Sequence, residues 1–97
     1  MEVRFRTNHL RLCYDSTSEA ARAWGTVVGR LFRARIQSLE AAETFEELFD
    51  VRSLRFHALR GGRRGQYAVD INAQWRLIVT RQRTMLVVEE VSNHYGD

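Results

Sequence analysis

The spacing of apolar residues changes near residue 52, and this change restricts the possible folds more than any other feature of the chain. Between residues 17 and 41 apolar side chains recur at helical spacing, whereas beyond residue 52 they alternate with polar ones. Four consecutive strands are predicted by the runs "SLRFHAL", "GQYAVDI", "WRLIVT" and "TMLVVEEV", and one short earlier strand by "VRF" at residues 3–5. This order predicts an α+β fold in which helices pack on an antiparallel sheet.

Two capping signals predict two helices ahead of the four strands. Ser16 and Glu19 have the spacing of a capping box, in which each side chain accepts a hydrogen bond from the other residue's free backbone N–H. This signal predicts a helix over residues 17–41. Thr44 and Glu47 repeat it and predict a short acidic helix afterwards.

Three residues are predicted to serve the backbone. Gly25 and Gly29 lie inside the predicted long helix, where each costs about 1 kcal/mol relative to alanine. Because residues four apart share a helix face, these glycines indicate close packing of a neighbouring element. Asn72, in the turn "DINAQW", is predicted to take the left-handed conformation that tight hairpins use.

Length and composition favour one modest domain, residues 1–97, in the cytoplasm. No apolar run approaches the roughly 18 residues of a membrane span, and "MEVRFRTNHLRL" lacks the apolar centre of a signal peptide. We therefore expect no membrane partner. Cys13 is the only cysteine, which excludes an internal disulfide, and we interpret it as a packing residue.

The positive charge is concentrated in one segment. Residues 40–50 contain five acids and no base, whereas residues 51–83 contain eight arginines and one acid, Asp70. The eight are Arg52, Arg55, Arg60, Arg63, Arg64, Arg76, Arg81 and Arg83. Such a segment favours a polyanionic partner. All fifteen basic residues are arginine, which suits phosphate binding but is equally explained by codon bias in a GC-rich genome.

Strand alternation places Arg55, His57 and Arg76 on the sheet face turned away from the core, with His57 held opposite Arg76. The loop "RGGRRG" borders this face, and its phosphate-binding candidates are Arg60, Arg63 and Arg64. RNA cleavage by the ribose 2′-OH needs a base, an acid and cations around the phosphorane. Two histidines, His57 and His94, can serve as base and acid. The residues show no metal-ligand spacing, so we expect no metal and no cofactor.

Simpler interpretations of the same residues remain open at this point. A strand histidine is more often a surface residue than a catalyst, and Arg63 and Arg64 fit a solvated loop. Trp75 is interpreted as a core residue, and Tyr67 either as a core residue or as a platform for base stacking. The residues alone support a basic RNA-binding α+β domain and no finer function.

The run "LRFHALRGGRRGQYAVDINAQWRLIV", followed by "VVEEVSNHY", resembles the HigB branch of the RelE/ParE superfamily, the toxins of type II toxin–antitoxin systems. The resemblance covers about 40 residues and implies a RelE-like fold. It implies an endoribonuclease that cuts mRNA in the ribosomal A site. It also implies silencing by a HigA-like helix-turn-helix antitoxin.

Within this resemblance, His57 and His94 correspond to proton-transfer histidines, and Arg76 corresponds to the arginine that stabilises the phosphorane. Many relatives end in Asp-Tyr-His, where this chain has Ser92, Asn93 and His94, so Tyr95 lies one place later and would assist. Two other functions keep the same fold. One is DNA gyrase inhibition of the ParE kind, which does not need the histidines, and the other is antitoxin or RNA binding without catalysis.

Overall fold

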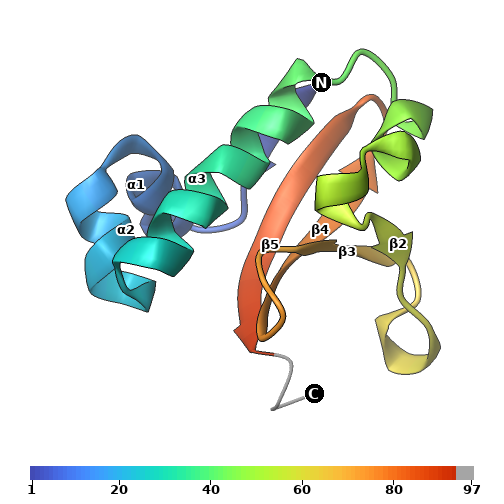
Figure 1. The fold of residues 1–97 in the computed structure, drawn as a ribbon. Helices are drawn as coiled ribbons and strands as arrows, with labels where there is room; N and C mark the ends of the chain where they lie inside the picture. Colours follow the sequence, from blue (N-terminus) through green and yellow to red (C-terminus); the bar gives the residue numbers. More distant parts are fainter. Residues whose placement is uncertain (94–97) are drawn as a thin grey trace.

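The computed structural model describes residues 1–93, in which α3 (Thr26–Ala41) packs on one face of a five-stranded sheet and two further α-helices pack beside α3 (Figure 1). The strands are β1 (Glu2–Phe5), β2 (His57–Ala58), β3 (Gln66–Asp70), β4 (Trp75–Gln82) and β5 (Met85–Asn93). The helices are α1 (Asn8–Asp15), α2 (Thr17–Trp24) and α3 (Thr26–Ala41). Short 3-10 turns are η1 (Glu46–Asp50), η2 (Arg52–Leu54) and η3 (Gly61–Arg63).

The sheet has the order β1-β5-β4-β3-β2. The last four strands pair antiparallel in chain order, and β1 lies parallel to β5. The α+β class, the early strand and the order of four consecutive later strands are therefore confirmed, although the first of the four is much shorter than predicted. Val3 and Phe5 pack against the core, and so do Tyr67 and Trp75, which were interpreted as core residues.

The helices differ from the prediction because the expected helix over residues 17–41 is broken at Gly25. The φ angle of Gly25 is +87°, so the chain turns there and α2 and α3 pack side by side. At Gly29 the backbones approach so closely that a Cβ atom would lie 2.8 Å from the carbonyl carbon of Ala20. The predicted close approach is confirmed for Gly29, whereas Gly25 ends a helix.

Helix α1 was not predicted, although its start has a recognisable signal. The Thr7 hydroxyl accepts a hydrogen bond from the Leu10 N–H at 3.1 Å, as an N-cap should. Ser16 accepts one from the Glu19 N–H at 3.2 Å and thus begins α2 as predicted. The charged residues of α1 conceal its apolar face, from which Leu10 and Cys13 enter the core.

The second capping signal is confirmed for Thr44 only, because the Glu47 carboxylate bonds to the preceding residue, and the element that follows is a 3-10 turn. Thr44 accepts from the Glu47 N–H at 3.3 Å, and the Glu47 carboxylate accepts from the Glu43 N–H at 3.0 Å. The following turn η1 buries Leu48 and leaves Phe49 49% exposed.

The strand predicted from "SLRFHAL" is mostly wrong. Leu54 and Phe56 are buried as expected, but β2 contains two residues only. Residues 52–54 form η2, and Arg55 has a left-handed backbone with φ +44°. The buried residues are therefore spaced by a turn and not by strand alternation.

The two faces of the sheet have different surroundings. The core lies between the sheet and α3, where Phe32, Ile36 and Leu39 contact the strand side chains of Leu77 and Val79 in one cluster. We call the opposite side the outer face. The register assigns to it His57, Gln66, Ala68, Asp70, Arg76, Ile78, Thr80, Val87, Glu90 and Ser92.

A β-bulge gives the outer face two neighbouring acids. Val79 pairs with Val88 and Ile78 pairs with Glu90, so Glu89 is an extra residue in β5. Val88 and Val91 consequently both pack on the core although they are three residues apart. Glu89 bonds to the outer-face Thr80 hydroxyl, which donates at 2.6 Å.

Candidate functional site

His57 and Arg76 lie on the same face of the sheet, as predicted, but they are not opposite each other. His57 is paired with Ala68, and Arg76 is paired with Asp70 on one side and Ser92 on the other. Strand β3 therefore separates the two, with a further offset of two residues along the strands. Strand spacing and rise place their Cα atoms about 12 Å apart.

The imidazole of His57 has a defined tautomer. Its Nδ1 lies 2.6 Å from the carbonyl oxygen of Arg55. A carbonyl oxygen can only accept a hydrogen bond, so Nδ1 carries the proton and donates it. Nε2 is then the ring atom that can exchange a proton with a ligand. The ring is half-buried, and its Nε2 is positioned by a backbone contact.

Arg55 reaches the outer face even though it is not in a strand. Its Nε forms an ion pair with Asp70 Oδ2 at 3.3 Å, and its side chain remains 73% exposed. Asp70 is also the cross-strand partner of Arg76, which is half-buried. The predicted group of His57, Arg55 and Arg76 is thus gathered on one face, with Asp70 between the arginines.

The glycine-arginine loop divides its arginines between two roles. Arg63 donates to Gln66 Oε1 at 3.0 Å and pairs with Glu90 at 3.6 Å, which ties the loop to the sheet. Arg60 and Arg64 are exposed, and neither forms a side-chain hydrogen bond or ion pair within residues 1–93. These two remain available for an anionic ligand.

The turn after β3 is supported from both sides. Arg35 of α3 donates from Nε to the carbonyl of Asp70 at 2.8 Å and from Nη2 to that of Ile71 at 3.2 Å. The Asn72 side chain accepts from the Gln74 N–H at 2.9 Å and the Trp75 N–H at 2.8 Å. The left-handed backbone predicted for Asn72 is wrong, because its side chain, and not a positive φ, closes the turn.

His94 and Tyr95, the other two predicted catalytic residues, lie outside the described residues. Strand β5 is described as far as Asn93, which pairs with Trp75 beside the Arg76–Ser92 pair. Sequence reasoning missed Asp70, Arg35 and Glu90 as members of the site. The signal for Asp70 was present, because it is the only acid among residues 51–83 and directly follows a buried strand position.

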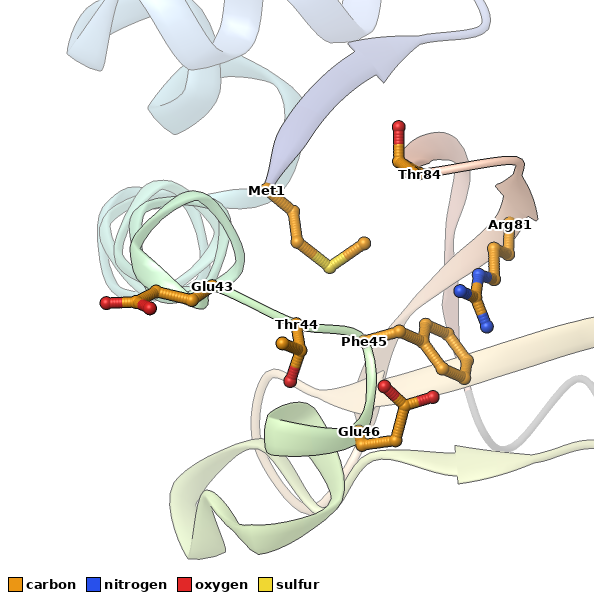
Figure 2. A pocket seen from close by; sticks show the side chains of 7 residues that line it. All are labelled: Met1, Glu43, Thr44, Phe45, Glu46, Arg81 and Thr84. Carbon is orange, nitrogen blue, oxygen red and sulfur yellow. The ribbon is translucent and has the colours of Figure 1, made fainter.

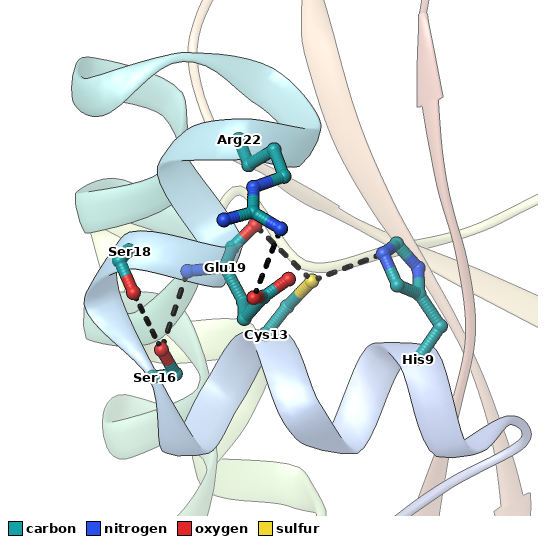
Figure 3. Close-up of polar contacts among 6 residues, drawn as sticks. All are labelled: His9, Cys13, Ser16, Ser18, Glu19 and Arg22. Atoms are coloured by element: carbon teal, nitrogen blue, oxygen red, sulfur yellow. Dashed lines mark hydrogen bonds and ion pairs between the residues drawn. The ribbon is translucent and has the colours of Figure 1, made fainter.

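A cysteine–histidine contact lies among the helices, and such pairs can act as nucleophiles. Cys13 Sγ lies 3.6 Å from His9 Nε2 and 3.8 Å from the carbonyl oxygen of Glu19, to which it donates (Figure 3). The thiol is fully buried, and burial, with the nearby Glu19 carboxylate, raises its pKa. Both effects oppose a thiolate, so the interpretation of Cys13 as a packing residue is confirmed.

Two hollows of the surface are lined by residues other than His57, Arg55 and Arg76. One, of about 260 Å³, is lined by Met1, Glu43, Thr44, Phe45, Glu46, Arg81 and Thr84 (Figure 2). Its Arg81 guanidinium lies 4.2 Å from the centroid of the core-side Phe45 ring, so this arginine is directed away from Arg76. A second, of about 400 Å³, runs along β1 and the start of α1. Neither contains a histidine.

Neither a metal site nor a membrane-spanning helix is found in the part of the chain that the structure describes. No three or more His, Cys, Asp or Glu side chains within residues 1–93 are grouped so as to hold a metal ion. Among the same residues, no helix is long and apolar enough to cross a membrane.

Comparison with solved structures identifies the fold. YafQ from Escherichia coli strain BL21(DE3) matches with a TM-score of 0.63 and 10% identity, over 98% of this chain and 94% of that one. The YoeB–YefM complex from Staphylococcus aureus matches with a TM-score of 0.63 and 15% identity, over 98% of both chains. The chain shares their fold.

A third structure, the YoeB/ParE toxin from Agrobacterium tumefaciens, has a TM-score of 0.59 and 15% identity, over 98% of this chain and 100% of that one. No protein-family model and no curated protein sequence matches the chain. The likeness therefore lies in the arrangement of helices and strands and extends over nearly the whole chain.

Proposed function

We propose that this chain is the toxin of a type II toxin–antitoxin system, of the HigB kind, and that it cleaves mRNA in the ribosomal A site. The shared fold with YafQ and YoeB supports the toxin assignment. The observation that carries the nuclease assignment is the backbone hydrogen bond that leaves His57 Nε2 available on the same face as Arg55 and Arg76. The protein would act in the cytoplasm, where ribosomes are.

The outer face contains groups suited to attack by a ribose 2′-OH. His57 Nε2 would move one proton, and His94, assisted by Tyr95, would move the other. Arg76, half-buried between two strands, would stabilise the charge of the phosphorane. The more exposed guanidinium of Arg55 would bind a neighbouring phosphate. Guanidinium groups supply the positive charge, so the proposed reaction needs no metal or other cofactor.

Two partners follow from this assignment. The exposed Arg60 and Arg64 would bind phosphates of mRNA or ribosomal RNA, and Arg63 would support the loop that carries them. A HigA-like helix-turn-helix antitoxin would silence the toxin. The occurrence of YoeB in a complex with YefM supports a protein partner of this kind.

The test is a cell-free translation reaction in which mRNA ends are mapped by primer extension, with and without ribosomes. We expect cuts at codon boundaries that require ribosomes and disappear with Arg76→Gln and with His94→Ala. Arg83→Gln is the matched control, since Arg83 lies in the β4–β5 turn and is exposed. Intact mRNA with the unaltered protein contradicts the nuclease, and inhibition of gyrase in a parallel supercoiling assay then supports the ParE-like function.

A further inference from the structure

Asp70 is an acid at the centre of a basic face. Its Oδ2 lies 3.3 Å from Arg55 Nε, and its strand position is directly opposite that of Arg76. Directly opposed residues of an antiparallel pair have Cβ atoms about 5 Å apart, so the carboxylate lies within reach of both guanidinium groups. The Asp70 side chain is 21% exposed, which leaves it accessible to a ligand arriving at these arginines.

The main chain of Asp70 has little freedom to withdraw. Arg35 holds its carbonyl at 2.8 Å and that of Ile71 at 3.2 Å, from the core side of the sheet. Bonds from a guanidinium are about twice as strong as those between neutral groups. Arg55 is different, because its side chain is 73% exposed and follows a left-handed turn. The acid is fixed, and the arginine that it pairs with can move.

A phosphate that binds Arg55 and Arg76 must therefore displace a resident carboxylate. It would replace Asp70 in the ion pair with Arg55, and it would experience the repulsion of the nearby negative charge. Two like charges about 6 Å apart near a protein surface would weaken binding roughly a hundredfold without salt, and screening at physiological ionic strength reduces this to the order of tenfold.

We propose that Asp70 is an internal competitor for phosphate that lowers the affinity of the outer face for single-stranded RNA. This inference rests on the proposed RNA-cleaving function. The ion pair between Arg55 and Asp70 is the closed state of the site, and RNA binding opens it by exchanging carboxylate for phosphodiester. Tight binding then requires further contacts, such as those from Arg60 and Arg64.

The experiment measures binding of a fluorescein-labelled ten-nucleotide 2′-O-methyl oligouridine by anisotropy at fixed ionic strength. The methyl group removes the attacking hydroxyl, so binding is measured without cleavage. Asp70→Asn keeps the size of the side chain and one acceptor oxygen and removes its charge. We expect this variant to bind about tenfold more tightly than the unaltered protein. Asp50→Asn, an exposed acid outside the outer face, should change affinity less than twofold.

A second pair of proteins, both carrying Arg55→Gln, distinguishes competition for Arg55 from a general effect of the Asp70 charge on RNA binding. In a protein that carries Arg55→Gln, the phosphate has lost the arginine that Asp70 occupies, so the gain from Asp70→Asn should fall to about threefold or less. Asp70→Ser provides a second charge-removing variant in case the asparagine protein folds poorly. Thermal unfolding of each variant establishes that the proteins compared are folded.

The outcomes distinguish this inference from the proposed function. If unaltered protein binds the oligonucleotide and Asp70→Asn binds equally or more weakly, Asp70 is not a competitor, and RNA binding by the outer face stands. If the unaltered protein, Asp70→Asn and Asp70→Ser all fail to bind the oligonucleotide, both the competitor role of Asp70 and the RNA-binding role of the outer face are overturned. Ribosome-dependent cleavage, measured separately with unaltered protein, reports on the proposed function alone.

Discussion

The imidazole of His57 donates to the carbonyl of Arg55, two residues earlier in the chain. Arg55 presents that carbonyl because its backbone is left-handed, with φ +44°, a conformation that non-glycine residues adopt infrequently. Strain of this kind is often retained where it aims a functional group. Here it holds the proton on Nδ1 without a carboxylate partner, and Nε2 remains available for chemistry.

His57→Gln is expected to lower mRNA cleavage by about 10²- to 10⁴-fold, the usual contribution of a proton-transfer group. Stability should change little because the ring is half-buried and outside the core cluster. The rate of ribosome-dependent cleavage and the thermal unfolding temperature are the two measurements. His9→Gln is the control, since His9 lies in α1 and contacts Cys13 of the same helix and Trp24 of α2. Equal loss of cleavage in both variants would assign the effect to folding.

At the scale of residues, strand alternation was sufficient to place His57 and Arg76 on one face, although Arg55 reaches that face from a left-handed turn. It did not predict how they are arranged there, because the register of β2 on β3 depends on a turn whose geometry the sequence does not reveal. Asp70 was missed for a different reason. In a sum of charges one acid among eight arginines is a small correction, whereas its position makes it the partner of two of them.

Among the elements, two glycines at helical spacing have different tasks. Gly25 supplies a positive φ between α2 and α3, and Gly29 supplies space for the backbone of Ala20. Gly29→Ala should destabilise the fold by about 1–3 kcal/mol, because the added Cβ lies 2.8 Å from a backbone carbon that cannot easily move. The measurement is the free energy of unfolding in urea.

Gly62→Ala is the matched control for the glycine prediction. A Cβ at Gly62 has no atom within 4 Å and its φ is not in the left-handed region. The substitution should therefore leave the free energy of unfolding within about 0.5 kcal/mol of the original. A Gly29→Ala protein as stable as this control would show that α2 and α3 separate at no cost.

The bulge in β5 creates an acid pair whose effect on stability depends on pH. Glu89 accepts two hydrogen bonds from Arg6 at 2.9 Å and one from Thr80, and the bond from Arg6 is the main reason why the pKa of Glu89 is lowered from 4.5. A lowered pKa in the folded state stabilises the fold above the unfolded value. That contribution is lost as pH falls below 4.5 through the folded pKa.

The contribution of the Glu89 carboxylate to stability is tested by urea unfolding of the unaltered protein and of Glu89→Gln at several pH values. Above pH 5 the unaltered protein should be more stable by about 1 kcal/mol or less, as expected for a partly exposed ion pair. The difference should shrink steadily below pH 4.5. Glu46→Gln, which alters an exposed acid of η1, should show no such convergence. A difference that is constant down to pH 3 would contradict the role of the Glu89 carboxylate.

The elements that sequence patterns predicted are those whose pattern is uninterrupted. Strands β3 and β4 alternate regularly and were predicted with their inward residues. The bulge in "VVEEV" shifts the strand alternation of β5, and the break at Gly25 interrupts the helical spacing between α2 and α3. No single residue type in the sequence specifies a bulge or a helix break. Helix α1 was missed because arginines and a histidine surround its few apolar positions.

The whole molecule does not present its basic segment as one surface. Arg81 lies over Phe45 on the core side, whereas Arg55 and Arg63 are paired with Asp70 and Glu90 on the outer face. The summed charge of residues 51–83 therefore overstates the field that an RNA strand would meet. In the η3 loop, residues 60–65, Arg60 and Arg64 are exposed and form no ion pair within residues 1–93, so they carry part of the charge that acids leave unneutralised.

RNA binding should accordingly depend on where charge is removed and not only on how much. Arg60→Gln/Arg64→Gln should weaken binding of the 2′-O-methyl oligonucleotide and make the slope of log affinity against log salt shallower by about 1.4, since each phosphate contact to a single strand contributes about 0.7. Arg22→Gln/Arg30→Gln lowers the formal net charge of +3 by the same two charges, but on the helices. Its slope should stay near that of the unaltered protein. Equal slopes for the two double variants would mean that net charge alone attracts RNA, and the η3 loop would lose its role as the contact.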